Sequence, residues 1–230
     1  MKIYARFRYL TCPYSLGLEF THADRVIPDL AFSYPNPVTA DVASKGHNAA
    51  LRIGISPIIY LHRGHWPKAD AAIFGRYLEN LACFTGLLLR NGHEVVLFES
   101  DLPDREATKL LMSRLVRESP VDGPMKLRVA QVRRVPELLA ELTGLDCIVA
   151  SRLHGVILSH LCIKPVLAIS YERKVKQHMK EMEQETFCLD IHSIRAEELE
   201  KAFDLLSSCP DAIKATIKAK IQEYRKKLIS

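Results

Sequence analysis

Residues 146–171, DCIVASRLHGVILSHLCIKPVLAISY, constrain the fold of this chain more than any other stretch. The pattern predicts a short apolar strand, a sharp turn, a short helix and a second apolar strand. Two strands joined by a helix form a parallel pair with a right-handed crossover. The stretch therefore predicts one βαβ unit. The turn after its first strand is where such a unit exposes backbone N–H groups to a ligand.

That turn carries a cation and a titratable group two residues apart. Arg152 offers a permanent charge that can bind phosphate or carboxylate through two hydrogen bonds, and His154 can move a proton near neutral pH. Both precede residues 155–156, where we expect the helix to begin and where its N-terminus favours anions. Together they predict a site for a small anion on which acid–base chemistry is done. The structural alternative is a solvated or ion-paired arginine and a histidine that caps its own helix.

Strand and helix signals alternate from residue 51 to the C-terminus. Such alternation predicts an α/β domain with a doubly wound parallel sheet, which binds ligands outside the carboxyl ends of its strands. We expect strands at 51–58, 93–99, 127–132, 147–150, 165–169 and 186–190, and helices at 70–90, 105–117, 136–142, 156–162, 173–183, 197–206 and 211–228.

Residues 1–48 differ from the rest because they lack enough periodic elements for a domain. Strand-like segments at 1–9 and 26–32 are followed by two Pro- and Gly-containing stretches, at 35–37 and 44–46, that are typical of a linker. We therefore divide the chain into 1–48, the remnant of an N-terminal domain with a linker, and 49–230, a Rossmann-like domain with a closing helix.

Polar clusters follow several of the expected strands and would converge at one edge of the sheet. Any single cluster can be an ordinary polar turn, but four of them at one edge favour a site. In the first cluster, Trp66 can stack on a sugar ring or simply pack on the domain. In the second, Asp101 and the nearby Asp104 suit helix capping better than catalysis. The four clusters are at 62–66, 99–101, 151–154 and 171–174.

Charge and cysteine content limit the partners and the compartment. The chain has 32 Lys and Arg against 27 Asp and Glu, a net charge of +5, and much of the late positive charge lies in the last helix. No long basic run carries interleaved aromatic residues, so nucleic acid is not an expected partner. Six scattered cysteines without a CxxC pair predict reduced thiols, and no His/Cys/Asp/Glu group has metal-ligand spacing. Because no signal-peptide pattern or membrane-spanning run is visible, we expect a cytoplasmic protein that needs no metal.

The last expected helix, 211–228, is amphipathic and basic. Its apolar stripe predicts docking on this or a neighbouring domain. The alternative is peripheral association with an anionic membrane, which basic amphipathic helices can also make. The stripe consists of Ile213, Ile217, Ile221, Tyr224 and Leu228.

Several segments resemble the polysaccharide pyruvyl transferase family. They are VIPDLAF at 26–32, the GIS turn at 54–56, NGHEVVLFESD at 91–101 and SRLHGVILSHLCIKPVLAISYERKV at 151–175. The most specific part is the Arg152-Leu153-His154-Gly155 motif, set between two strands and followed by Lys174. The resemblance runs from about residue 26 to the final helix.

The resemblance implies a two-domain protein of the glycosyltransferase-B type that transfers a pyruvyl group from phosphoenolpyruvate to hydroxyls of a sugar or glycan acceptor. The product is a pyruvate ketal, phosphate is released, and no cofactor is needed beyond the donor substrate. Residues 49–230 would form the donor-binding C-terminal domain, and 1–48 would be the tail of the acceptor-binding N-terminal domain. A separate N-terminal domain or partner subunit would then complete the protein.

The resemblance also implies roles for individual residues. His154 would be catalytic, as the acid that protonates the methylene carbon or stabilises the departing phosphate. Many relatives carry an arginine close behind the GIS-like turn, where this chain has Pro57-Ile58-Ile59-Tyr60, so Arg63 would supply that charge from further along the loop. The residues expected to bind substrate are Arg152, Leu153, Ser151, Gly155, Lys174 and Arg63.

Two alternatives stay open. A nucleotide-sugar glycosyltransferase on the same architecture would also bind a diphosphate at a helix N-terminus, and fold alone does not decide between them. A truncated donor-binding remnant or subunit would have no independent activity. Binding of phosphoenolpyruvate rather than a nucleoside diphosphate discriminates the first alternative, and an exposed apolar docking face would favour the second.

Overall fold

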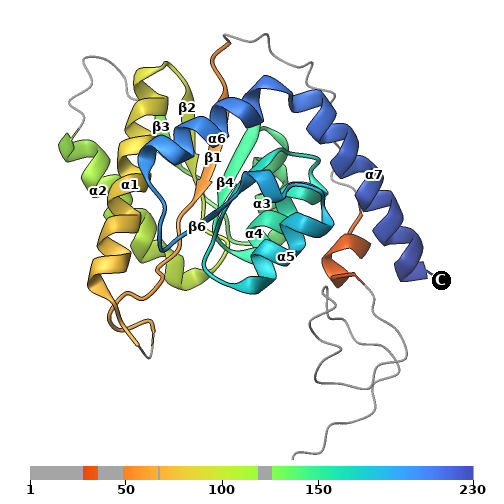
Figure 1. Ribbon diagram of the computed structural model, residues 1–230, viewed down its shortest axis with the longest axis horizontal. Helices are drawn as coiled ribbons and strands as arrows, with labels where there is room; N and C mark the ends of the chain where they lie inside the picture. Colours follow the sequence, from red (N-terminus) through yellow and green to blue (C-terminus); the bar gives the residue numbers. More distant parts are fainter. Residues whose placement is uncertain (1–27, 36–48, 67, 119–125, 230) are drawn as a thin grey trace, which may run out of the picture.

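A computed structural model of the chain describes residues 28–35, 49–66, 68–118 and 126–229, which form an α/β domain built on one parallel sheet (Figure 1). The sheet has six strands in the order β3-β2-β1-β4-β5-β6, and all neighbouring strands are parallel. This order and pairing confirm the expected doubly wound fold. The strands are β1 Arg52–Ser56, β2 Glu94–Leu97, β3 Leu127–Val129, β4 Cys147–Ala150, β5 Val166–Ser170 and β6 Cys188–Asp190.

The helices form two packed groups. The division between the groups corresponds to the point where the strand order reverses direction. α1 packs against α2 and α6, while α4 packs against α3 and α5. Right-handed crossovers place helices on opposite faces when the strand order reverses direction. The helices are α1 Ala71–Arg90, α2 Arg105–Glu118, α3 Val135–Thr143, α4 Leu153–Leu161, α5 Arg173–Glu181, α6 Ala196–Ser208 and α7 Pro210–Ile229, with short 3-10 turns η2 Leu30–Ser33, η3 Leu102–Asp104 and η4 Glu185–Phe187.

From residue 51 onward the predicted elements are all present, and two boundaries differ in ways that affect the site. The strand-like segment predicted at 26–32 is wrong over its described part, where Leu30–Ser33 form the 3-10 turn η2, and the one predicted at 1–9 lies outside the described residues. The first strand ends at Ser56 rather than residue 58, because Pro57 has no N–H to continue a ladder. The predicted helix start at 156 is wrong, because α4 begins at Leu153 with Arg152 as its extended N-cap. His154 and Gly155 therefore lie in the first turn of the helix and not in the loop before it.

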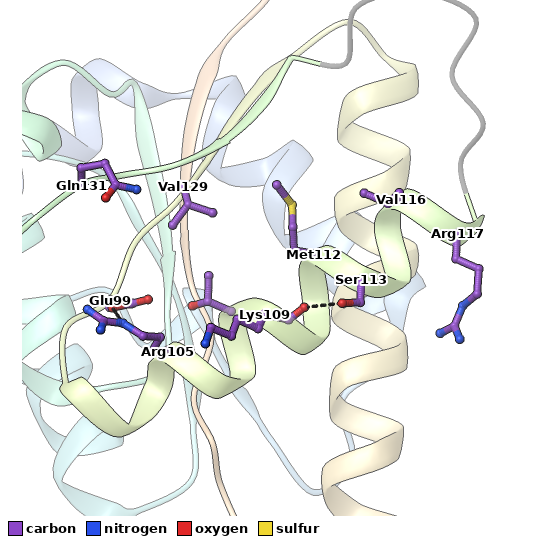
Figure 2. A pocket seen from close by; sticks show the side chains of 10 residues that line it. Glu99, Arg105, Lys109, Met112, Ser113, Val116, Arg117, Val129 and Gln131 are labelled. Atoms are coloured by element: carbon purple, nitrogen blue, oxygen red, sulfur yellow. Dashed lines mark hydrogen bonds and ion pairs between the residues drawn. The ribbon is translucent and has the colours of Figure 1, made fainter.

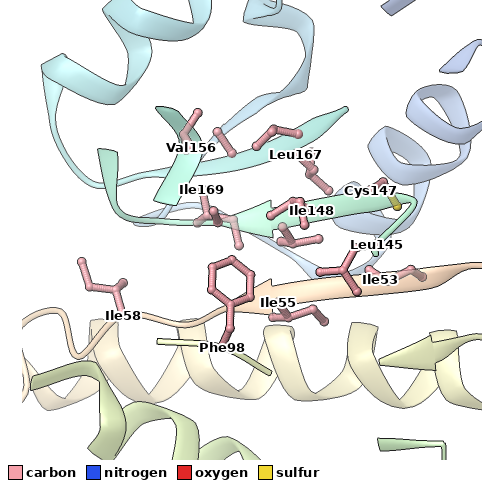
Figure 3. Close-up of a cluster of buried hydrophobic side chains, with 14 of the residues drawn as sticks. Ile53, Ile55, Ile58, Phe98, Leu145, Cys147, Ile148, Val156, Leu167 and Ile169 are labelled. Carbon is pink, nitrogen blue, oxygen red and sulfur yellow. The ribbon is translucent and has the colours of Figure 1, made fainter. Parts of the chain in front are cut away.

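The core surrounds the two central strands, which are buried on both faces as parallel strands usually are. The GIS segment lies inside β1 and is not a turn. At Gly54 a β-carbon would lie 2.7 Å from Leu145 Cδ1 and 2.8 Å from Ile148 Cδ1. Figure 3 shows Leu145, Ile148 and Phe98 pointing into one apolar cluster beside β1. Glycine at this position lets these larger side chains fill the layer above the strand.

The C-terminal helix α7 docks on the domain and on residues 28–35. Ile213, Ile217, Ile221 and Tyr224 are buried, so this part of the apolar stripe faces protein. Phe32 is also buried, and its ring lies 5.0 Å from that of Tyr224. This burial confirms the predicted docking of the helix, and this part of the stripe is not available to a lipid surface. Among the residues that the structure describes, none of the helices has the length and apolar character needed to cross a membrane.

The predicted division at residues 48/49 stays a prediction. The eight residues of the first part that the structure describes are held against the second part through α7. Arg225 donates from Nε to the Phe32 carbonyl at 3.0 Å and from Nη2 to the Tyr34 carbonyl at 2.7 Å. The rest of 1–48 lies outside the described residues.

Candidate functional site

The candidate site lies at the point where the strand order reverses. β1 and β4 are neighbours, with Ser56 opposite Ala150, and the chain leaves them toward opposite sides of the sheet. In an open parallel sheet this point creates a crevice outside the carboxyl ends of the two strands. The Ser151–His154 segment follows β4 directly, so the fold brings the motif that the sequence singled out to this crevice.

Arg152 is held by a buried carboxylate. Its Nε donates to Oδ2 of Asp104 at 2.8 Å and its Nη2 donates to Oδ1 at 2.9 Å. The Asp104 side chain is fully buried, while the Arg152 side chain is 19% exposed. Asp104 Oδ1 also accepts the N–H of Ile59 at 3.0 Å. One carboxylate thus ties the loops that follow β1, β2 and β4 to one another.

The positive charge of Arg152 is already balanced in part by acidic neighbours. Burial by itself would lower the pKa of this guanidinium, but the hydrogen bonds and the charge of Asp104 outweigh burial and raise it. Asp101 Oδ2 lies 3.4 Å from Nη2 as a second acidic neighbour. The prediction that Asp101 and Asp104 cap a helix is wrong: no side-chain bond caps η3, and the Asp104 carboxylate serves Arg152 and Ile59.

Ser151 lies below the surface of the crevice. It is fully buried, and its Oγ lies 3.2 Å from the hydroxyl oxygen of Tyr77. That hydroxyl also accepts the N–H of Ile58 at 3.1 Å. Burial raises the pKa of Tyr77 to about 12, so the phenol stays neutral at physiological pH. Ser151 therefore supports the floor of the crevice, and its side chain does not reach the solvent.

The first turn of α4 presents His154 to solvent. The His154 side chain is 65% exposed, and its Nε2 lies 3.8 Å from Oδ2 of Asp29. Leu153 is half-buried and packs on the core. The N-cap residue Arg152 makes no side-chain bond to the helix. The helix N-terminus is thus not closed by its own N-cap side chain, which leaves its N–H groups suited to an anion.

Gly155 allows α4 to approach the loop after β2. A β-carbon at this position would lie 3.2 Å from Ser100 Oγ and 3.6 Å from the β-carbon of Ala150. The Ser100 hydroxyl in turn lies 3.3 Å from Ser56 Oγ, at the end of β1. Gly155 therefore keeps the helix N-terminus close to the carboxyl ends of both central strands.

Among the residues predicted to bind substrate, Arg63 and Lys174 do not take part in the contacts described above. Arg63 lies in the loop after β1, and Lys174 lies in the first turn of α5, after β5. Both side chains are exposed. Neither makes a hydrogen bond or an ion pair with another residue in the described ranges 28–35, 49–66, 68–118 and 126–229. Both cations are therefore available to an anionic ligand at this edge.

An aromatic cluster gathers at the same edge from the ends of β1, β5 and β6. The Tyr60 ring lies 5.0 Å from Trp66, 5.1 Å from Tyr171 and 5.6 Å from His192. Trp66 meets its two tyrosine neighbours edge-on, so it packs on the domain as well as bordering the site. Burial, together with the nearby Glu172, raises the pKa of Tyr171 to about 12. The sequence points to Trp66, but it does not show the contact of Trp66 with Tyr60 or the contact between Tyr60 and His192, which lie 132 residues apart.

Three potential metal ligands also come together at this edge. One ligand atom from each of His62, His65 and Glu106 lies within 4.8 Å of the others. His65 and Glu106 are 41 residues apart, so ligand spacing along the chain could not reveal the group.

A separate hollow of about 830 Å³ lies beside α2 and the end of β3 (Figure 2). It is lined by the apolar side chains of Met112, Val116 and Val129 and by the cations Arg105 and Lys109. Arg105 is engaged by Glu99, with 3.2 Å between Nε and Oε2. None of the seven residues predicted for the site lines this hollow. Those residues follow β1, β4 and β5 instead.

Comparisons with known proteins bear on the family and the fold. The family model described as polysaccharide pyruvyl transferase matches residues 16–173. No curated protein matches the chain. Among solved structures, an O-GlcNAc transferase mutant from Thermobaculum terrenum aligns with a TM-score of 0.54 and 12% identity. The alignment covers 83% of this chain and 35% of that protein, so this chain spans about a third of the length of its structural relative. At such identity the likeness shows the fold alone, which is that of a glycosyltransferase-B-type protein.

Proposed function

This chain belongs to the polysaccharide pyruvyl transferase family, and we propose that it transfers a pyruvyl group from phosphoenolpyruvate to two hydroxyls of a sugar. The observation that carries this proposal is the position of the Arg152-Leu153-His154-Gly155 motif. It opens α4 at the reversal of strand order, inside the segment that matches the family. In this proposal the motif would combine backbone N–H groups, cations and an exposed imidazole in one donor site.

The donor would bind at the N-terminus of α4. Phosphoenolpyruvate carries a phosphate and a carboxylate, which need fixed positive charge and N–H donors. The first turn of α4 supplies the N–H groups, and the exposed Lys174 and Arg63 supply charge that no carboxylate of the described chain balances. Arg152 uses two of its five N–H donors on Asp104. In this proposal Arg152 first fixes the position of the helix and then contributes its remaining donors to the ligand.

His154 would act as the proton donor. An acid near neutral pH must protonate the methylene carbon of phosphoenolpyruvate before a sugar oxygen can attack the adjacent carbon. His154 is exposed in the first turn of the helix that would bind the phosphate, and an imidazole is the side chain suited to this step. The exposed side chain can meet a sugar that approaches from solvent.

The reaction then balances without a cofactor. The proton from His154 turns the methylene into a methyl group, and the first sugar hydroxyl adds to the cationic carbon and returns its proton to the histidine. Phosphate leaves with the electrons of its C–O bond, and the second sugar hydroxyl takes its place. The second proton goes to phosphate, so the products are a pyruvate ketal and inorganic phosphate. Holding both substrates in register would supply much of the rate enhancement.

We further propose that the reaction takes place in the cytoplasm and that a separate acceptor-binding part takes part in it. Cys83, Cys162, Cys188 and Cys209 are free thiols, which suits a reducing compartment. The acceptor-binding part is proposed because this chain spans only part of its structural relative.

A transfer assay tests the function. The chain is incubated with phosphoenolpyruvate labelled at its methylene carbon and a panel of sugars, and the ketal methyl signal and released phosphate are measured together. His154→Ala is expected to reduce both signals by about 10²–10⁴-fold, the usual contribution of general acid catalysis. His93→Ala, just before β2 at the opposite, amino end of the strands, serves as the control and should keep the wild-type rate. Unchanged turnover in His154→Ala, or transfer from a nucleotide sugar in place of phosphoenolpyruvate, would refute the assignment.

A further inference from the structure

We propose that His62, His65 and Glu106 form a binding site for one divalent transition-metal ion, with Zn²⁺ as the best fit. The site would lie in the loop after β1, facing the first turn of α2. The inference does not depend on pyruvyl transfer, because it rests on the geometry of three side chains that the proposed reaction does not use.

The three ligand atoms lie close enough together to be brought around one ion. They lie within 4.8 Å of one another, and a tetrahedral ion with bonds of about 2.0–2.2 Å needs its ligands about 3.3–3.6 Å apart, so modest side-chain rotations would complete the site. His65 Nε2 and Glu106 Oε2 are only 2.7 Å apart. A small rotation of either side chain would therefore open room for an ion, with no change in the backbone.

The backbone of the loop after β1 brings His62 and His65 close together. The N–H of His65 donates to the carbonyl of His62 at 3.1 Å, which closes a turn. Two residues of this loop have left-handed backbone, Leu61 at φ 55° and Gly64 at φ 93°. The conformation of Leu61 is costly for a leucine, and such strain often accompanies a functional site. The N–H of Asp70 donates to the Leu61 carbonyl at 2.9 Å and anchors the far end of the loop.

The surroundings of His62 and Glu106 suit metal ligands. The His62 ring packs edge-on against Phe74 at 5.0 Å, which fixes its orientation. Its Nδ1 is buried and has no hydrogen-bond partner among the residues described, a condition that is rare for a buried polar atom. The Glu106 side chain is 47% exposed, so its carboxylate has room to rotate toward an ion.

The kind of ion follows from the donors and from the nearby charges. Two imidazoles and one carboxylate match the three protein ligands of many zinc sites, with a fourth position left open. Ca²⁺ and Mg²⁺ prefer sites made of oxygen ligands. The positive charge of Lys109 acts on Glu106 and would repel a cation. Net negative charge around the site therefore does not explain why a cation would bind. Affinity would have to come from direct coordination by imidazole, which favours a transition metal.

A bound ion would form a second link between the loop after β1 and the segment that contains η3 and α2. The loop after β1 is already linked to η3, just before α2, through Ile59 N–H and Asp104. The metal would link the same loop to α2 a few residues further along both segments. It would therefore stiffen the loop that carries Arg63 and Trp66.

The test is titration of the full chain with Zn²⁺ by calorimetry, together with the absorption spectrum of the Co²⁺-loaded protein. We expect one saturable site. In His65→Ala and Glu106→Gln the affinity should fall by more than about 10–100-fold, since even a residue that only orients a ligand has an effect of that size. His192→Ala is the matched control, because His192 lies 2.9 Å from Asp190 as a histidine–carboxylate pair outside the proposed ligand set. Thermal unfolding without metal checks that the variants fold.

The Co²⁺ spectrum separates this site from adventitious binding to thiols, since Cys83 and Cys209 are exposed. Coordination by nitrogen and oxygen gives visible bands without the intense near-ultraviolet band of a cobalt–thiolate bond. The proposal fails if no saturable Zn²⁺ binding is found, if His65→Ala binds as tightly as the wild type, or if the thiolate band appears.

Discussion

Arg152 donates two hydrogen bonds to the fully buried carboxylate of Asp104, at 2.8 and 2.9 Å, across 48 residues of sequence. The same carboxylate binds the N–H of Ile59. The arginine that the sequence marks as an anion ligand is thus also the residue that joins the loops around the crevice. Its substitution should affect folding as well as binding, and experiments on this motif have to separate the two effects.

Arg152→Ala should destabilise the fold. It would leave Asp104 buried without its cation, and removal of one partner of a buried pair costs about 3–5 kcal/mol. The free energy of unfolding in urea measures the loss. Arg105→Ala is the control, because the Arg105–Glu99 pair is more exposed and such pairs contribute about 0–1 kcal/mol. Equal losses in the two variants would show that the Asp104 pair does not stabilise the fold.

Gly155→Val should also destabilise the fold, through crowding. Even a β-carbon at this position would lie 3.2 Å from Ser100 Oγ, and overpacking of this kind costs about 1–3 kcal/mol. Gly75→Ala in α1 is the matched control, since its β-carbon would meet nothing within 4 Å. That change should raise stability by about 0.4–1 kcal/mol through the unfolded chain. Chemical denaturation of both variants checks the pair, and a stabilising Gly155→Val would contradict the close approach of α4 to Ser100.

Stability should fall in mild acid because of a buried histidine pair. His160 Nδ1 lies 3.0 Å from His178 Nε2, and both residues are buried. Burial lowers the pKa of His178 to about 3 and the pKa of His160 well below its usual value. The unfolded chain takes up protons near pH 6.5, while the folded pair stays neutral to lower pH. The free energy of unfolding is therefore highest above about pH 6.5 and falls as the pH drops toward the folded pKa values.

The expected slope is about 1.4 kcal/mol per pH unit for each buried neutral histidine, measured between about pH 6 and 4.5. His178→Gln should reduce the slope by about one histidine's share. The partly buried His93, whose pKa burial also lowers, contributes equally to both proteins. The same slope in His178→Gln and in the wild type would be inconsistent with a neutral buried pair.

The bounds of an element could be predicted from the sequence where a local run of apolar residues defines them. Strand β4, Cys147–Ala150, has the predicted bounds, because it is a short buried apolar run between Asp146 and Ser151. The start of α4 was missed by three residues. Arg152 is not a favoured N-cap residue, and Gly155 lowers helix propensity, so neither marks a helix that begins at Leu153.

The sequence could not predict contacts between distant segments. Asp104 lies in an acidic turn and suggested a helix cap, whereas its carboxylate is taken by Arg152 from beyond two further strands. The contact between His65 and Glu106 could not be predicted either, because it depends on the order of the strands in the sheet. The alternation of strands and helices along the chain does not specify that order. The residues of the motif itself were accessible from sequence because they are contiguous, from Ser151 to Gly155.

The most direct test of the proposed donor site is a calorimetric titration of the chain with phosphoenolpyruvate and, separately, with uridine diphosphate. Lys174→Ala, in the first turn of α5, removes a cation from the edge of the crevice, whereas Lys180→Ala removes an exposed cation from the last turn of the same helix. We predict saturable binding of phosphoenolpyruvate that is weakened in Lys174→Ala and unchanged in Lys180→Ala, with no comparable binding of uridine diphosphate. Absence of phosphoenolpyruvate binding, or equal losses in the two variants, would contradict a donor site at the N-terminus of α4.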